Sequence, residues 1–182
     1  MTQPDTPLPP PLAAAIASYL QARDALAVGT QPAALLPGQI IAFACGQPMR
    51  NADEIARRLG EDLHARRLYR QVLASRRLAH SPLQACAQSA GAVTRRDGDH
   101  FTLYFRTSRA ASEQVYVTLE VHGSLPLAEG SVIDVHAVGE TQVLSVRFPP
   151  LAGRRTQRLF QQDDAVLSLL QDDAAELEVV QP

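Results

Sequence analysis

Lysine is missing from this sequence of 182 residues, and all 17 of its basic side chains are arginine. Arginine is suited to bidentate contacts with carboxylates and phosphates. An alanine-rich chain without lysine is also what a GC-rich genome encodes, and we favour that explanation. The 19 acidic residues leave a net charge of −2, which gives the chain as a whole no attraction to nucleic acid or membrane.

Cysteine is scarce as well. Cys45 and Cys86 are far apart in the sequence and fit neither a CxxC pair nor the spacing of zinc ligands. We expect two partly buried thiols in a reducing compartment. Nothing around Cys45 resembles the signature of a cysteine enzyme, so a nucleophilic role is not indicated.

Long apolar runs and targeting signals are absent too. No run approaches the length of a membrane span, and residues 1–12 contain no basic residue of the kind that opens a secretory signal. The sequence therefore predicts a cytoplasmic protein with no membrane insertion. Export without a cleavable signal would leave no mark on these features.

Catalytic fingerprints are also missing. The serines have no GxSxG context and no glycine-rich phosphate loop occurs, so we expect neither an enzyme nor a cofactor. Glu120, His122, Asp134 and His136 could supply zinc or acid–base chemistry if their strands were neighbours. The same alternation is typical of strands with a polar outer face, which is the commoner origin of such a pattern.

The first half of the sequence predicts a flexible start followed by helices. Residues 1–11 contain five prolines and should be extended and mobile, with Pro10 and Pro11 suited to the first turn of a helix. Residues 12–90 are expected to be helical, including a short helix over Leu83–Ala90. The apolar run Ile40–Cys45 predicts either a strand or a buried connector.

A helix is expected to begin at Asn51, because Glu54 three residues later resembles a capping box. Beyond Gly60 the apolar stripe moves to another face, which predicts a break between Gly60 and His64. The following helix should end near His80, before a proline.

From residue 91 onward the pattern changes to an α+β sheet domain, residues 91–182. Alternating residues predict strands over Phe101–Phe105, Val115–Val121, Val132–Val138 and Gln142–Phe148, with hairpin turns at Asp97-Gly98 and Gly139-Glu140. Pro149-Pro150 should end this run of strands. A helix over Leu159–Leu170, in which Asp163 either interrupts the apolar stripe or caps a later start, and a strand over Ala175–Val180 complete the prediction. The fold class is thus α+β, with a helical N-terminal half and a mainly antiparallel C-terminal sheet carrying one packed helix.

A basic stripe is expected on the second long helix, where Arg66, Arg70 and Arg77 would share one face. It could contact an acidic protein or nucleic acid. Few aromatic residues and the acidic stretch after Arg158 make nucleic acid the weaker of the two. A solvated helix face, or an internal partner for that acidic stretch, is the plainest explanation.

The order of elements from Val115 to Val180 resembles the C-terminal domain of the length-control proteins of type III secretion, which regulate flagellar hook and injectisome needle length. Pro126, Leu127, Gly130 and the alternating strand Val132–Val138 occupy comparable places. The resemblance implies a domain that docks on the cytoplasmic part of the export gate and switches which substrates are accepted. The family's long ruler has no counterpart here.

The sequence thus predicts a non-enzymatic protein that acts by protein–protein contact, possible roles being a type III secretion accessory or substrate-specificity switch protein. Its alternatives are a secretion chaperone or adaptor, and a nucleic-acid-binding regulator using the arginine-rich helix. The expected contact residues are Arg66, Arg70, Arg77, Pro126, Leu127 and Gly130.

Overall fold

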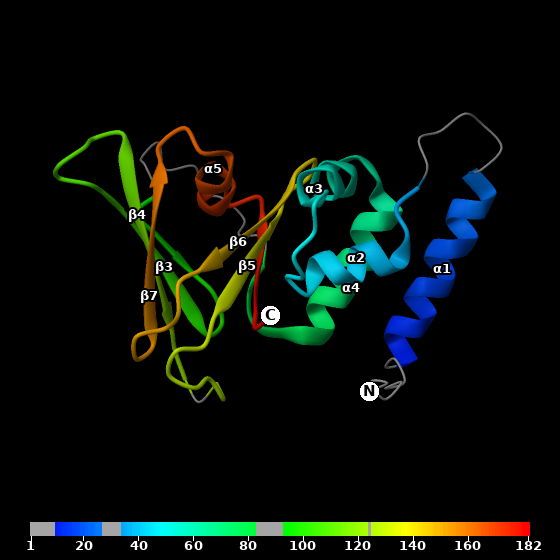
Figure 1. Ribbon diagram of the computed structural model, residues 1–182, viewed down its shortest axis with the longest axis horizontal. Helices are drawn as coiled ribbons and strands as arrows, with labels where there is room; N and C mark the ends of the chain where they lie inside the picture. Colours follow the sequence, from blue (N-terminus) through cyan, green and yellow to red (C-terminus); the bar gives the residue numbers. More distant parts are fainter. Residues whose placement is uncertain (1–9, 27–33, 83–92, 124) are drawn as a thin grey trace. The chain divides into compact units, whose positions relative to one another are not determined.

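The computed structural model describes residues 10–26, 34–82, 93–123 and 125–182, which fall into two compact units, Met1–Ser75 and Arg76–Pro182 (Figure 1). The helices are α1 (Pro10–Leu26), α2 (Pro37–Ala44), α3 (Ala52–Glu61), α4 (Leu63–Arg76) and α5 (Ala165–Gln171). The strands are β1 (Arg77–Ser81), β2 (Arg95–Asp97), β3 (Phe101–Thr107), β4 (Gln114–Val121), β5 (Ile133–Val138), β6 (Val143–Phe148), β7 (Arg155–Gln161) and β8 (Glu176–Val180). The predicted helix over Leu83–Ala90 and most of the proline-rich start lie outside the described residues.

The helical unit begins with α1 at Pro10, as expected. The prediction for Ile40–Cys45 was wrong, because this run belongs to helix α2. Pro37 occupies the first turn, where its missing N–H leaves no bond unmade, and the Gln39 side chain accepts a hydrogen bond from the Leu36 N–H at 2.9 Å. Ile40 and Phe43 are buried three residues apart, which is helical rather than strand spacing. Cys45 caps the end of this helix and is half-buried.

The break between α3 and α4 is confirmed. Helix α3 ends at Glu61 and α4 begins at Leu63, and the Asp62 carboxylate between them accepts hydrogen bonds from the backbone N–H groups of His64 and Ala65 at 2.8 and 3.1 Å. Aspartate at this position satisfies N–H groups that a new helix leaves unpaired.

Two details of these helices differ from the prediction. Asn51 does stand at the N-terminal cap of α3, but its side chain makes no capping bond. Glu54 pairs with Arg57 at 2.7 Å. Helix α4 ends at Arg76 rather than near His80, and the chain continues directly as strand β1. Among the described helices, none combines the length and apolarity that crossing a membrane requires.

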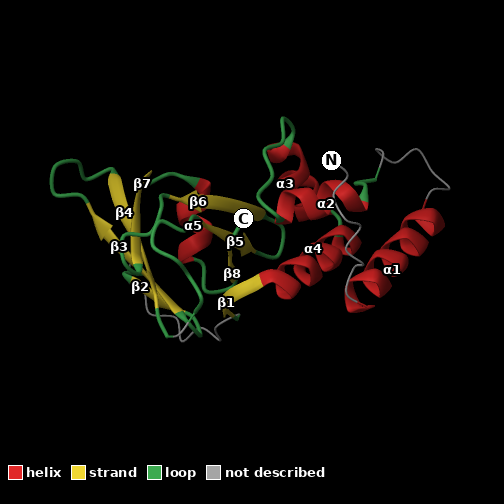
Figure 2. Ribbon diagram, turned by 60° about the horizontal axis from the view of Figure 1, so that its bottom comes forward, coloured by secondary structure: helices red, strands yellow, loops and turns green. Residues whose placement is uncertain are grey.

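The second unit contains two antiparallel sheets, confirming the α+β fold with a mainly antiparallel C-terminal half. Sheet A has the strand order β1-β8-β5-β6 and sheet B the order β2-β3-β4-β7. Figure 2 shows these strands in yellow with α5 in red beside β5 and β6. The inner faces of both sheets and the apolar side of α5 form one core, which includes Leu103, Val117, Val135, Phe148, Leu170 and Val179.

Side-chain and backbone hydrogen bonds connect the two sheets at both sides of this core. At one side, the Ser81 hydroxyl of β1 donates to the Asp97 carbonyl of β2 at 3.0 Å. At the other, the Thr156 hydroxyl of β7 donates to the Pro149 carbonyl at 2.7 Å. The sheets therefore form a sandwich whose open edges are partly bridged.

The β2–β3 hairpin is confirmed, but its turn lies two residues later than the predicted Asp97-Gly98, with Asp99 and His100 as the central residues. Gly98 is required for a different reason than a left-handed turn. Its N–H donates to the Phe101 carbonyl at 2.8 Å, and its φ is not among the positive values. A Cβ at this position would lie 2.1 Å from the ring of Phe101, which is fully buried. Glycine is therefore the residue that lets the core ring pass close to the backbone.

The β5–β6 hairpin is also confirmed, with its turn one residue later than predicted. Val138 pairs with Val143, and the Gly139 N–H donates to the Gln142 carbonyl at 2.8 Å. Glu140 and Thr141 are consequently the central residues, and the predicted Gly139-Glu140 turn was displaced by one position.

The prediction of one helix over Leu159–Leu170 was wrong in its first half. Leu159 lies in β7, which pairs with β4 and follows Pro149-Pro150, so the prolines do not end the strands. Helix α5 begins only after Asp164, whose carboxylate accepts from the Val166 N–H at 2.8 Å. The leucines on either side of this boundary happen to fit helical spacing, which conceals the strand.

Arg96 connects sheet B to the end of α5. Its guanidinium is almost completely buried and donates to the carbonyls of Leu170 at 3.2 Å, Asp172 at 2.6 Å and Ala175. The last carbonyls of a helix have no partners within the helix, and a cation there is favoured by the helix dipole. This buried arginine therefore has a structural role.

Candidate functional site

The predicted basic stripe does not exist as one surface. Arg77 is not on helix α4 but at the start of β1, where its guanidinium lies 3.8 Å from the Glu178 carboxylate. Arg66 is buried, and it donates to the Gly60 carbonyl at 2.9 Å across the break between α3 and α4. Arg70 is half-buried. The stripe prediction was wrong because it assumed one long helix whose arginines all face water.

Pro126, Leu127 and Gly130 lie together in the loop between β4 and β5, as their sequence proximity requires. Pro126 and Gly130 are exposed, whereas Leu127 packs partly against the core. Gly130 has a φ of +78° and its N–H donates to the Leu151 carbonyl at 3.0 Å. The loop is thus held by the Gly130 hydrogen bond and by the partial burial of Leu127.

The possible catalytic group does not assemble. Glu120 lies in β4 of sheet B, and His122 directly follows that strand, whereas Asp134 and His136 lie in β5 of sheet A. Each carboxylate has its own arginine: Glu120 pairs with Arg155 and Asp134 with Arg147, both at 2.8 Å. Within the described part of the chain, no three histidine, cysteine or acidic residues lie close enough to hold a metal ion.

A different polar row crosses sheet A in register. His80 of β1, Glu178 of β8, His136 of β5 and Ser145 of β6 are successive cross-strand partners, and we call them the polar row. His136 and Glu178 are buried. Burial lowers the pKa of His136 to about 4 and raises the pKa of Glu178 to about 7, the latter against the opposing influence of Arg77. Both groups are thereby held towards their neutral forms.

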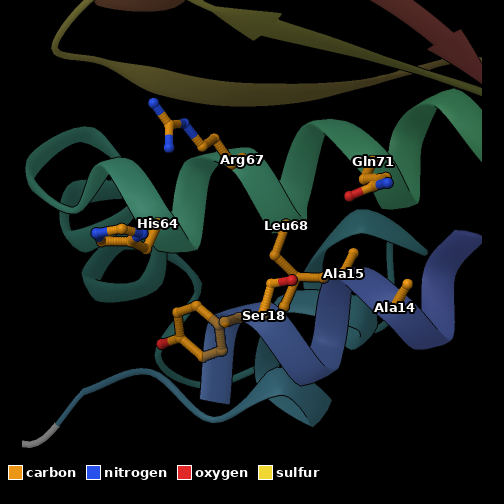
Figure 3. A pocket seen from close by; sticks show the side chains of 8 residues that line it. Ala14, Ala15, Ser18, His64, Arg67, Leu68 and Gln71 are labelled. Atoms are coloured by element: carbon orange, nitrogen blue, oxygen red, sulfur yellow. The ribbon is translucent and has the colours of Figure 1, made fainter. Parts of the chain in front are cut away.

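A shallow hollow lies between α1 and α4 in the helical unit (Figure 3). Ala14, Ala15 and Ser18 line it from α1, and Leu68 of α4 points towards them. The Gln71 side chain of α4 donates to the Pro11 carbonyl of α1 at 3.4 Å.

The outer face of sheet B is the most distinctive surface of the second unit. One end of this face is internally satisfied by a paired row of Asp97, Thr102, Glu120 and Arg155, which are cross-strand neighbours. The Thr102 hydroxyl lies 2.8 Å from both Asp97 and His122, and Arg155 pairs with Glu120. Little hydrogen-bonding capacity is left for another molecule there.

The other end of the same face is an open row consisting of Arg106 of β3, Tyr116 of β4 and Leu159 of β7. Tyr116 is 36% and Leu159 42% exposed, and both are among the few large apolar residues at the described surface. Leu159 lies on β7, the last strand in the order of sheet B. A paired aromatic and aliphatic side chain beside an arginine is a composition common at protein interfaces.

Comparison with family models, curated proteins and solved structures finds no match for the chain. The open row was not predicted from the sequence, because Leu159 is predicted in a helix rather than on a strand beside Tyr116. The sequence gives little signal for this strand, because only Thr156 and Phe160 are buried along it and the three residues between them are exposed.

Proposed function

We propose that this protein acts without catalysis, by binding another protein through the open row of sheet B. The observation that carries the proposal is the exposed pair Tyr116 and Leu159, which are directly opposite each other on neighbouring strands. Exposed apolar side chains in contact contribute more to binding than to folding, because water leaves them only when a partner covers them.

The specific role we propose is that of an accessory or substrate-specificity switch protein in a type III secretion system, located in the cytoplasm. Support comes from the order of β4, the β5–β6 hairpin, α5 and β8, which follows the order of that family's C-terminal domain. Strand β7 is an addition to the pattern, and it contributes Leu159 to the open row. The partner would then be the cytoplasmic domain of the export gate.

The test is isothermal titration calorimetry of the full-length protein with the purified cytoplasmic domain of an export gate. We expect the double variant Tyr116→Ser, Leu159→Ser to weaken binding by about tenfold or more, since interface anchors of this type dominate affinity. Leu63→Ser is the matched control, because Leu63 is a leucine of the helical unit that is 61% exposed.

Two results would count against the proposal. Unchanged affinity in the double variant would remove the open row as the docking surface. Absence of binding by the wild-type protein would contradict the export-gate assignment and leave docking to be tested with other partners.

A further inference from the structure

The open row continues into a hollow at the β3–β4 end of sheet B. The hollow has a volume of about 560 Å³ and is lined by Arg106, Thr107, Ser108, Arg109, Ala110, Tyr116 and Gln157. These side chains offer guanidinium, hydroxyl and amide groups, and the lining contains no carboxylate. Glu113, the acidic residue of the same loop, is not part of the lining. A space of this size accommodates several side chains rather than a single ion.

The arginines of this hollow differ from those elsewhere in the same unit. Between Arg76 and Pro182, as far as the chain is described, Arg106 and Arg109 are the two arginines whose side chains make no ion pair or hydrogen bond with another described residue. Both are exposed. Arginine donors left open towards a hollow without acidic groups are arranged for a ligand that brings its own negative charge.

The charge of the surrounding unit limits what that ligand can be. Residues 76–182 contain ten arginines and thirteen acidic residues, a net charge of −3. A long polyanion such as nucleic acid, or an anionic membrane, would be attracted by the arginines of the hollow but repelled by the acidic residues elsewhere on the unit. A short acidic segment of a protein needs only the local positive charge.

We propose that the hollow binds the side-chain carboxylates of an acidic segment in a protein partner, while neighbouring apolar residues of that segment contact Tyr116 and Leu159. This inference rests on the proposed function and specifies the chemistry of the partner. Arg106 and Arg109 are the donors, and the Tyr116 ring is shared between the acidic and apolar contacts. Binding should weaken as salt increases, because the arginines are exposed.

The experiment selects short random peptides on the immobilised full-length protein and measures the enriched peptides by fluorescence anisotropy. We expect enrichment of aspartate or glutamate next to an aromatic or aliphatic residue. Arg106→Gln with Arg109→Gln should weaken binding of these peptides by about tenfold. Arg50→Gln, which removes one exposed arginine of the helical unit, is the charge control and should stay within about twofold. Arg106→Glu with Arg109→Glu should reverse the selection towards basic peptides.

The outcomes separate this inference from the proposed function. Enriched peptides without acidic residues, or equal binding by the Arg106→Gln, Arg109→Gln variant, would overturn the acidic-segment proposal. If those same peptides bind the Tyr116→Ser, Leu159→Ser variant more weakly than the wild-type protein, the proposed docking function stands without the acidic-segment proposal. Failure to enrich any peptide, or binding that none of these four substitutions changes, would overturn both.

Discussion

The two sheets of the second unit place polar and apolar residues in opposite environments. In sheet A the polar row of His80, Glu178, His136 and Ser145 crosses the strands in register, and its central residues are buried. In sheet B the open row of Arg106, Tyr116 and Leu159 also crosses in register, yet its apolar members are exposed. Side-chain alternation thus identifies the two faces of a sheet, whereas burial decides which face is available to a partner.

The largest expected effect on stability compares a buried arginine of sheet B, Arg96, with an exposed one, Arg106. Arg96→Met should lower the free energy of unfolding by about 3 kcal/mol, because three backbone carbonyls lose a buried charged donor. Arg106→Met on the neighbouring strand should change it by less than about 0.5 kcal/mol. Urea unfolding of both variants measures the difference, and similar losses would contradict the distinction between buried and open arginines.

The next prediction concerns the turn where the two sheets meet. Gly98→Ala should destabilise the protein by about 2 kcal/mol, because the added methyl group would overlap the buried Phe101 ring. Gly153→Ala is a useful contrast: its φ is +62° and nothing lies within 4 Å of its Cβ position, so backbone strain alone should cost about 1 kcal/mol. Thermal unfolding ranks the two, and a harmless Gly98→Ala would refute the close approach.

The polar row predicts a dependence of stability on pH. The carboxyl of Glu178 has an ordinary pKa of 4.5 and a folded pKa of about 7, so the folded state binds the extra proton between these values. Its contribution to stability is therefore greatest below about pH 4.5 and is lost as the pH rises through 7.

Glu178→Gln removes this titration. The unfolding free energy of the variant relative to wild type should rise by on the order of 1 kcal/mol between acidic and mildly alkaline pH. Burial of His136, whose pKa is lowered to about 4, acts in the opposite direction and is retained in both proteins. A difference that does not change with pH would contradict the buried, proton-retaining state of Glu178.

The smallest effect on stability is expected in the open row. Leu159→Ser should change the free energy of unfolding by less than about 0.5 kcal/mol, since the side chain is already 42% exposed. Leu167→Ser in α5, where the leucine is buried, is the matched control and should cost several times more, about 3 kcal/mol. Equal losses would mean that Leu159 serves the core rather than a partner.

Strong local patterns were sufficient to predict much of the fold. Strands β3, β4, β5, β6 and β8 follow from period-two alternation, and the break after Gly60 follows from the shift of the apolar stripe. The edge strand β7 was missed because only Thr156 and Phe160 are buried along it, so its pattern is weak.

The candidate site could not be predicted, because it depends on pairing between distant strands. Register places Tyr116 opposite Leu159, and separates Glu120 from Asp134 into different sheets. The sequence also cannot distinguish a buried arginine such as Arg66 from an open one such as Arg106 when both lie among polar residues. Such contacts are set by tertiary structure rather than by local propensity.

Hydrogen–deuterium exchange of the full-length protein, alone and in complex with its partner, tests the docking surface most directly. The account predicts slower exchange in β4 and β7, the strands that carry Tyr116 and Leu159, with the export-gate domain as the first partner to be tried. Protection confined to the Arg66–Arg77 region, with β4 and β7 exchanging as in the isolated protein, would contradict it.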